Sequence, residues 1–121
     1  MSQGVGTPGP WWRAAPLAPG VLLILGTGIL QRPDTVTPTR HVVEIQGMTF
    51  RPRVLEVSRG DTVAWVNRDM VPHTATATGK PAWSTGTLLQ GQSGEQVATD
   101  SGTLPYFCEL HPVMKGTLIV R

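Results

Sequence analysis

Short runs in which apolar and polar residues alternate follow one another from His41 to the last residue of the chain. In the first run, Val43 and Ile45 fall on one face, and Glu44 and Gln46 fall on the other. Alternation with a period of two residues is typical of β-strands that bury one face. No stretch after His41 repeats its apolar residues at the intervals of an amphipathic helix. The pattern therefore restricts this part of the chain to an all-β fold.

Turn residues divide the same part of the chain into seven predicted strands, at residues 41–47, 53–58, 62–67, 74–78, 96–99, 106–108 and 117–120. The alternation points Leu55, Val57, Val63 and Trp65 toward the interior. Seven or eight short strands in about 80 residues predict a small antiparallel Greek-key β-sandwich or barrel.

The charge of the chain argues against nucleic acid as a partner. Residues 41–121 carry seven basic and seven acidic side chains, so the net charge of +2 comes from residues 1–40. A nucleic-acid binder gathers Lys and Arg on one face without compensating acids. At 121 residues the chain is also too short for a multidomain enzyme. Its one cysteine, Cys108, has no partner for an internal disulfide, so the fold depends on its core, on a metal, or on both.

Residues 1–32 form a separate segment, in which the stretch from Ala14 to Leu30 has no charged residue. At 17 residues this stretch is at the lower limit for crossing a bilayer, and the two tryptophans before it suit a membrane interface. We expect either an export signal or an uncleaved anchor that tethers the protein through residues 11–30; a disordered tail or a misassigned start is the third alternative. Both functional alternatives place the protein in the periplasm or elsewhere outside the cytoplasm. Residues 33–40 are then an extended linker, and residues 41–121 are the folded domain.

One short segment carries most of the chemistry in this sequence. It places a thiol, an imidazole and a thioether three residues apart, at Cys108, His111 and Met114, in the loop before the last predicted strand. Thiolate and thioether sulfurs favour Cu(I), and imidazole binds copper in either oxidation state. His73, on a separate loop 35 residues upstream of Cys108, supplies a fourth ligand. Two histidines, one thiolate and a weak axial methionine are the ligand set of a blue-copper electron-transfer site.

Each of these residues has a simpler explanation when it is taken alone. Cys108 would be a buried structural thiol, Met114 a core side chain and His73 a surface or capping histidine. The regular spacing of the set argues against a coincidence of all three. His41 has no partner at ligand spacing, and we expect it to be a surface residue on a strand edge.

Three segments of the sequence resemble the cupredoxins, the type 1 blue copper proteins. They are the run from Val57 to Asn67, the dipeptide Pro72-His73, and the loop Cys108-x-x-His111-x-x-Met114. The short spacing of the loop is most similar to that of the amicyanins within the plastocyanin-like branch. The resemblance extends over residues 41–121 and implies a cupredoxin-like Greek-key β-sandwich.

The resemblance also implies one copper ion per chain and a role for each candidate ligand. His73, Cys108 and His111 would be the equatorial ligands, with both histidines binding through Nδ1, and Met114 would be the axial ligand. Thr74 departs from the family, which has Asn after the first ligand histidine. A threonine hydroxyl at this position is still able to hydrogen-bond across to the cysteine loop.

These observations predict a small electron carrier that cycles copper between Cu(II) and Cu(I). We expect no enzymatic activity, because no coordination position remains for a substrate. A redox donor and a redox acceptor are expected to dock where the edge of His111 reaches the surface, on a patch formed by Met70, Val71, Pro72, Pro112 and Val113. The carrier is expected to be a monomer, with Trp65 and Trp83 packed in the core. The alternatives are a copper-trafficking protein without a redox partner and a metal-free β-sandwich that binds other proteins.

Overall fold

The computed structural model describes residues 20, 26, 28–33 and 35–121. The chain divides into two units, residues 1–35 and residues 36–121. Most of the expected signal or anchor segment, residues 1–32, lies outside the described residues. In the part of the chain that the structure describes, no helix is long and apolar enough to cross a membrane.

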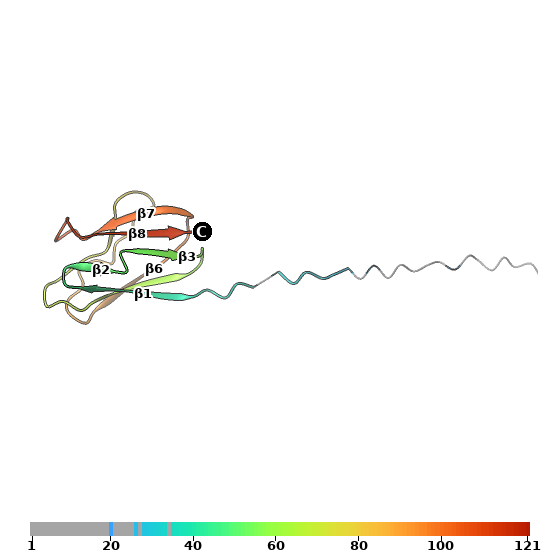
Figure 1. Ribbon diagram of the computed structural model, residues 1–121, viewed down its shortest axis with the longest axis horizontal. Coiled ribbons are helices and arrows are strands. Elements are labelled where there is room, and N and C mark those ends of the chain that lie inside the picture. Colours follow the sequence, from blue (N-terminus) through green and yellow to red (C-terminus); the bar gives the residue numbers. More distant parts are fainter. Residues whose placement is uncertain (1–19, 21–25, 27, 34) are drawn as a thin grey trace, which may run out of the picture. The chain divides into compact units, whose positions relative to one another are not determined.

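Eight strands make up the ordered framework of the described residues (Figure 1). They are β1 (Arg40–Gln46), β2 (Thr49–Arg51), β3 (Val54–Val57), β4 (Thr62–Asn67), β5 (Thr76–Ala77), β6 (Ser93–Val97), β7 (Gly102–Phe107) and β8 (Lys115–Val120). They form two four-stranded sheets with the orders β2-β1-β4-β6 and β3-β8-β7-β5. The all-β sandwich predicted from the alternation is confirmed.

Both sheets are mixed, which differs from the antiparallel arrangement expected throughout. β1 pairs with β4 in parallel, and β3 pairs with β8 in parallel. The other four pairings among the described strands are antiparallel. After β1 the chain turns back into β2, continues into β3 of the other sheet, and only then returns to β4 beside β1. Because the chain passes through the other sheet before it reaches β4, β4 runs in the same direction as β1, whereas a simple hairpin would make the two strands antiparallel.

Three of the differences between the observed and the predicted strands have identifiable reasons. β2 was not predicted, because three residues with one inward side chain, Phe50, show no alternation. β6 begins at Ser93 because its pairing with β4 continues through Gly94. β7 begins at Gly102 although Pro105 lacks an N–H, because its outer neighbour β5 has only two residues.

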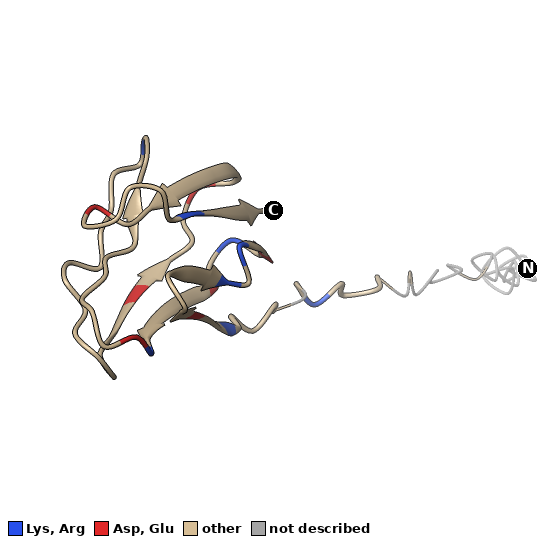
Figure 2. Ribbon diagram, turned by 60° about the vertical axis from the view of Figure 1, so that its left-hand side comes forward, with Lys and Arg blue, Asp and Glu red and all other residues tan. Residues whose placement is uncertain are grey.

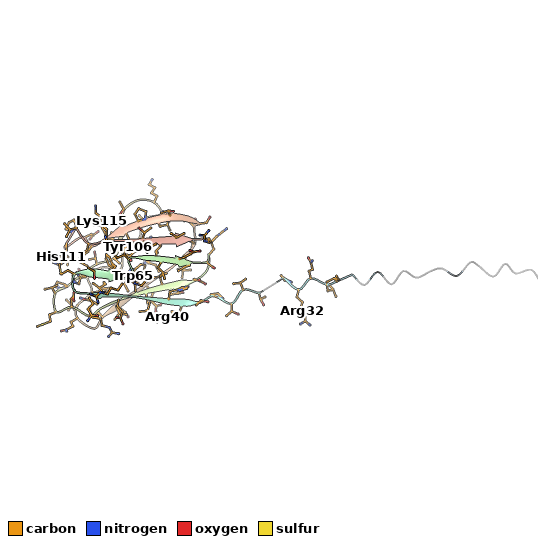
Figure 3. The ribbon with its side chains drawn as sticks, viewed as in Figure 1. Arg32, Arg40, Trp65, Tyr106, His111 and Lys115 are labelled. Atoms are coloured by element: carbon orange, nitrogen blue, oxygen red, sulfur yellow. The ribbon has the colours of Figure 1, made fainter. Side chains whose placement is uncertain are left out.

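The core lies between the two sheets and contains the residues that the alternation pointed inward. Val43, Ile45, Val63 and Trp65 are completely buried. Half-buried Trp83 stacks on Trp65, with ring centroids 5.0 Å apart. Figure 3 shows Trp65 inside the domain, with His111 at one end of it. The packing of both tryptophans against the core agrees with the expectation from the sequence.

Tyr106 joins this aromatic cluster and fixes the position of β7 against β8. Its ring lies edge-on to Phe50 and Trp65, with centroids 4.7 and 5.4 Å away. Its partner on β8 is Gly116, where an added Cβ would lie 2.2 Å from Cζ of the Tyr106 ring. Burial raises the pKa of Tyr106 to about 12. Only glycine fits opposite this ring, so the two strands that flank the Cys108 loop are held in one register.

The start of the parallel β1–β4 ladder is held by Asp61. Its carboxylate accepts hydrogen bonds from the backbone N–H groups of Thr39 at 2.9 Å and Ser58 at 3.0 Å, and it lies 2.9 Å from Nε2 of His41. The N–H of Thr39, then His41 and Ser58, lower the pKa of Asp61 to about 2. His41 is therefore half-buried and hydrogen-bonded, which corrects the expectation of a simple surface residue on a strand edge.

Charged side chains of both signs are distributed over the domain (Figure 2). Several pair with a charge of opposite sign: Arg40 of β1 lies 2.9 Å from Glu95 of β6, across the intervening β4, and Arg121 pairs with Glu56 of β3. Exposed pairs of this kind stabilise a fold by at most about 1 kcal/mol each. Stability therefore comes mainly from the apolar core between the sheets.

Candidate metal centre

The loop between β7 and β8 is held together by its own backbone. The N–H of His111 donates to the carbonyl of Cys108 at 3.2 Å, and the N–H of Met114 donates to the carbonyl of His111 at 2.9 Å. The N–H of Cys108 closes the loop by donating to the carbonyl of Met114 at 3.1 Å. Three-residue turns repeated in this way carry the three candidate ligands on one compact segment. The regular spacing in the sequence thus corresponds to a regular local structure.

His73 reaches the same place from a different loop, which depends on the buried Asn67 at the end of β4. The Asn67 side-chain amide donates to the carbonyls of Val71 and Leu88, both at 2.8 Å, and its Oδ1 accepts from the N–H of Asp69 at 2.8 Å. His73 and Leu88 also exchange two backbone hydrogen bonds, at 3.1 and 2.7 Å. These contacts fix the backbone on both sides of His73.

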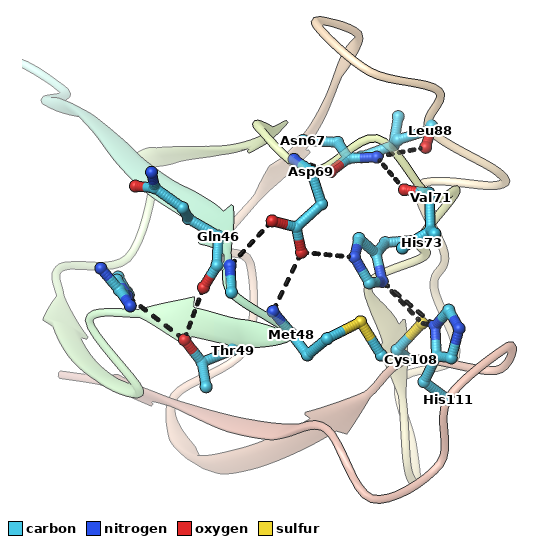
Figure 4. Close-up of polar contacts among 12 residues, drawn as sticks. Gln46, Met48, Thr49, Asn67, Asp69, Val71, His73, Leu88, Cys108 and His111 are labelled. Carbon is cyan, nitrogen blue, oxygen red and sulfur yellow. Dashed lines mark hydrogen bonds and ion pairs between the residues drawn. The ribbon is translucent and has the colours of Figure 1, made fainter.

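The two loops bring three of the four predicted ligands into direct contact (Figure 4). Sγ of Cys108 lies 3.7 Å from Nδ1 of His73 and 3.7 Å from Nδ1 of His111, and the two Nδ1 atoms are 3.2 Å apart. His73 and Cys108 are completely buried, and His111 is half-buried. Met114, the fourth predicted ligand, ends the same loop and is 3% exposed. All four predicted residues therefore belong to one end of the domain.

Asp69 determines which nitrogen of His73 faces this cluster. Its carboxylate accepts from the N–H groups of Gly47 at 2.7 Å and Met48 at 2.9 Å, and it lies 2.9 Å from Nε2 of His73. Burial raises the pKa of Asp69, but the N–H groups of Met48 and Gly47, together with His73, outweigh burial and keep the pKa below its usual value. An ionised carboxylate only accepts hydrogen bonds, so Nε2 carries the proton of the neutral ring. Nδ1 is then left with a lone pair that points toward Cys108 and His111.

The cluster has the chemistry of a metal site. Two imidazole nitrogens and a sulfur converge within 4.8 Å of one another, and Nδ1 of His73 is an acceptor without a proton to share. Such an arrangement is satisfied by a cation at its centre, and separations of 3.2 to 3.7 Å suit an ion at about 2.0 Å from nitrogen and about 2.3 Å from sulfur. The sulfur and imidazole donors suit copper better than the hard cations magnesium and calcium.

Thr74 connects the two loops directly. Its backbone N–H donates to Sγ of Cys108 at 3.3 Å, and its Oγ1 accepts from the N–H of Glu109 at 2.9 Å. The expected hydrogen bond between the threonine hydroxyl and the cysteine loop is therefore present, with the hydroxyl oxygen as the acceptor. The roles of Asn67 and Asp69 were not predicted from the sequence. The only signal for Asp69 was an acid four residues before His73, and many surface acids have such a position.

A β-sandwich that gathers two histidines, a thiol and a buried methionine at one end has the framework of a type 1 copper protein. The chain belongs to the copper binding proteins of the plastocyanin/azurin family, whose family model matches residues 39–121. The cupredoxin resemblance inferred from the sequence is thereby confirmed, and copper is the metal of this family.

Amicyanins are among the proteins similar to this chain. It is 35% identical to amicyanin from Paracoccus denitrificans and 30% identical to amicyanin from Paracoccus versutus, each over 84 residues. These matches cover 66% of this chain and 64% of each relative, so the matched part spans slightly less than two thirds of the relatives' length. The solved Cu(I) form of an amicyanin variant, with one methionine changed to alanine, matches with 32% identity and a TM-score of 0.65 over 72% of this chain and 87% of that chain.

Proposed function

We propose that this protein is a type 1 copper protein that carries one electron at a time. Each chain would hold one copper ion through Nδ1 of His73, Sγ of Cys108, Nδ1 of His111 and the thioether of Met114. Copper supplies the redox change by moving between Cu(II) and Cu(I). The convergence of the two Nδ1 atoms with the Cys108 sulfur, within 4.8 Å, is the observation that carries the proposal.

The surroundings of the donors favour a carrier over a trafficking protein. His73, Cys108 and Met114 are at most 3% exposed, so another protein could not reach these three donors to exchange the metal ligand by ligand. Hydrogen bonds hold both loops in place, so the donors would move little when the charge of the copper changes. A small structural change keeps the reorganisation barrier to electron transfer low. With four protein donors, no position is left for a substrate, which supports a carrier rather than an enzyme.

The test is the visible and EPR spectrum of the purified full chain after addition of Cu(II), with Cys108→Ser as the control. We expect an intense thiolate-to-copper absorption band and narrow copper hyperfine splitting, both absent from the variant. An oxidation and reduction cycle should then proceed reversibly with one electron per copper. A colourless parent protein, or a parent spectrum equal to that of Cys108→Ser, would contradict the proposal.

The surface around His111 is suited to contact with redox partners. Met70 and Val113 are both 87% exposed, and Val71 is 42% exposed. Pro72, which follows Val71, is also exposed. Pro112 is exposed as well and lies between the half-buried His111 and Val113 in the sequence. Electron-transfer encounters use small interfaces, below about 1,200 Å² of buried surface. We therefore assign this apolar patch to the docking of a donor and an acceptor protein.

Val113→Asp tests the patch, because Val113 is 87% exposed and its side chain is not a metal donor. The variant should keep the copper spectrum and should exchange electrons at least about tenfold more slowly with a physiological partner, since a charge is then buried in an apolar contact. Stopped-flow mixing measures the rate. An unchanged rate would remove the patch from the proposal. Val97→Asp, the same substitution at an exposed valine beside the start of β4, is the control.

The remaining parts of the proposal concern the location of the protein. The uncharged stretch from Ala14 to Leu30 supports export or tethering by residues 1–32, with the copper domain outside the cytoplasm. A small carrier that meets its partners transiently is expected to act as a monomer.

A further inference from the structure

Three hydroxyl side chains form a continuous line from the Cys108 loop to the surface. The N–H of Glu109 donates to Oγ1 of Thr74 at 2.9 Å, and this Oγ1 lies 3.0 Å from Oγ1 of Thr76. Oγ1 of Thr76 lies 3.0 Å from Oγ of Ser84, which accepts from the N–H of Gly86 at 3.1 Å. Thr74 is 2% exposed, Thr76 is half-buried and Ser84 is exposed, so the line runs outward from the interior.

The burial of Thr74 gives the line a direction. A hydroxyl has one proton to donate, and the Thr74 oxygen already accepts from Glu109. Its own proton needs an acceptor, because a buried donor without a partner is unfavourable. Oγ1 of Thr76 is the acceptor within hydrogen-bond distance. Thr74 therefore donates to Thr76, Thr76 donates to Ser84, and the last proton of the line is at the exposed Ser84.

The line is attached to the backbone on both sides of Cys108. Thr74 contacts Cys108 through its own N–H, which donates to Sγ at 3.3 Å, and contacts the next residue through Glu109. Thr76 pairs with Phe107, the residue before Cys108, where β5 meets β7. Thr76 and Ser84 also form an isolated β-bridge. The same three hydroxyl residues thus tie together the segments before and after the cysteine.

We propose that Thr74, Thr76 and Ser84 act as one hydrogen-bonded chain that positions Cys108, with Ser84 as its surface end. Thr76 and Ser84 are positioning residues that do not contact the metal donors themselves. Hydrogen bonds in a row polarise one another in a low-dielectric interior, so loss of the middle member weakens the bond to Glu109. The importance of this line of hydroxyls for electron transfer rests on the proposed function, whereas the hydrogen bonds of the line can be tested without copper.

The first test measures hydrogen exchange of the Glu109 amide by NMR in the metal-free full chain. Thr76→Val removes the hydroxyl and keeps the shape of the side chain, so the Glu109 amide should exchange ~10-fold faster. Thr76→Ser keeps a hydroxyl and should return the rate close to that of the parent. Thr103→Val, an exposed substitution on β7, is the matched control and should leave Glu109 unchanged.

Ser84→Ala tests the surface end of the chain with a small change at an exposed position. It should also speed Glu109 exchange, by less than Thr76→Val does. In the copper-loaded protein, Thr76→Val and Ser84→Ala should shift the thiolate-to-copper band and the reduction potential in the same direction, with the larger shift in Thr76→Val.

The proposal is overturned if Glu109 exchange in Thr76→Val equals that of the parent, or if Thr76→Ser fails to reverse the change. If Thr76→Val speeds Glu109 exchange and Ser84→Ala does not, Ser84 is not part of the hydrogen-bonded line, and the proposal as stated is overturned. Failure of the protein to form a blue copper centre would contradict the proposed function. The hydrogen-bonded line of Thr74, Thr76 and Ser84 would then be judged by the exchange rates of the metal-free protein alone.

Discussion

Two aspartates hold the two ends of the β1–β4 ladder with the same set of contacts. Asp61 accepts from two backbone N–H groups and lies 2.9 Å from Nε2 of His41. Asp69 accepts from two backbone N–H groups and lies 2.9 Å from Nε2 of His73. Each carboxylate joins β1, or the segment beside it, to the chain next to β4. The Asp61 and Asp69 contacts therefore both hold the chain around β1 against the chain around β4.

The difference lies in what the second nitrogen of each histidine meets. Nδ1 of His73 faces Cys108 and His111, whereas His41 is outside the one His, Cys and carboxylate cluster found in the described residues. A carboxylate partner therefore fixes a histidine without making it a metal ligand. The candidate metal centre lies at the Asp69–His73 pair because the cysteine loop faces Nδ1 of His73.

The largest effect is expected at Asn67, which supports the Asp69 end and has no counterpart beside Asp61. Asn67→Ala leaves the carbonyls of Val71 and Leu88 and the N–H of Asp69 without their partner. The free energy of unfolding of the metal-free protein should fall by about 2–4 kcal/mol. Urea unfolding measures it, with the exposed Gln90→Ala as the control. A loss no larger than that of the control would contradict the support assigned to Asn67.

The second prediction separates the two aspartates by metal binding. Asp69→Ala removes the partner that fixes the His73 ring, so copper affinity should fall 10- to 100-fold, the range expected for such partners of ligand histidines. Asp61→Ala should leave copper affinity unchanged, because His41 contacts no metal donor. Competition with a chelator of known affinity measures both. Equal losses of copper affinity in the two variants would contradict the separate roles assigned to Asp61 and Asp69.

The smallest effect is the acid dependence of the Asp61 end. The pKa of Asp61 falls from its usual value near 3.8 to about 2 in the folded protein, so the unfolded chain binds the proton first on acidification. The stabilisation is complete above about pH 4 and is lost as the pH falls through about 2. Asp61→Asn should therefore show a smaller fall in the thermal midpoint between pH 5 and pH 2 than the metal-free parent. A fall as steep as that of the parent would assign the acid dependence to other groups.

What the sequence could predict depended on how local the structure is. The loop from Cys108 to Met114 is closed by its own backbone hydrogen bonds, and its ligand spacing is visible in seven consecutive residues. Strands that bury alternate residues, such as β1 and β8, were likewise visible. Local geometry leaves a pattern in neighbouring positions, and such a pattern can be recognised in a single chain.

The parts that escaped prediction depend on partners far away in the sequence. The parallel pairing of β1 with β4 follows from a crossing between sheets and not from any local pattern. Asp69 binds the turn at Gly47 and Met48, more than 20 residues earlier, and a lone acid before a histidine does not reveal such a contact. His41 was assigned to the surface because Asp61, its partner, is equally remote.

The pairing of β8 with β3 has a consequence for the order of folding. Val120 lies beside Val57, so this ladder joins segments separated by most of the domain's sequence. Contacts of such long range form slowly, because the chain loses much of its entropy before they are made. The loop that carries Cys108, His111 and Met114 leads directly into β8, and His73 lies on a separate loop after β4. The strand that follows these three donors is therefore fixed by the pairing of longest range in the described domain, so the geometry of the candidate metal centre depends on contacts between the two ends of the folded sequence.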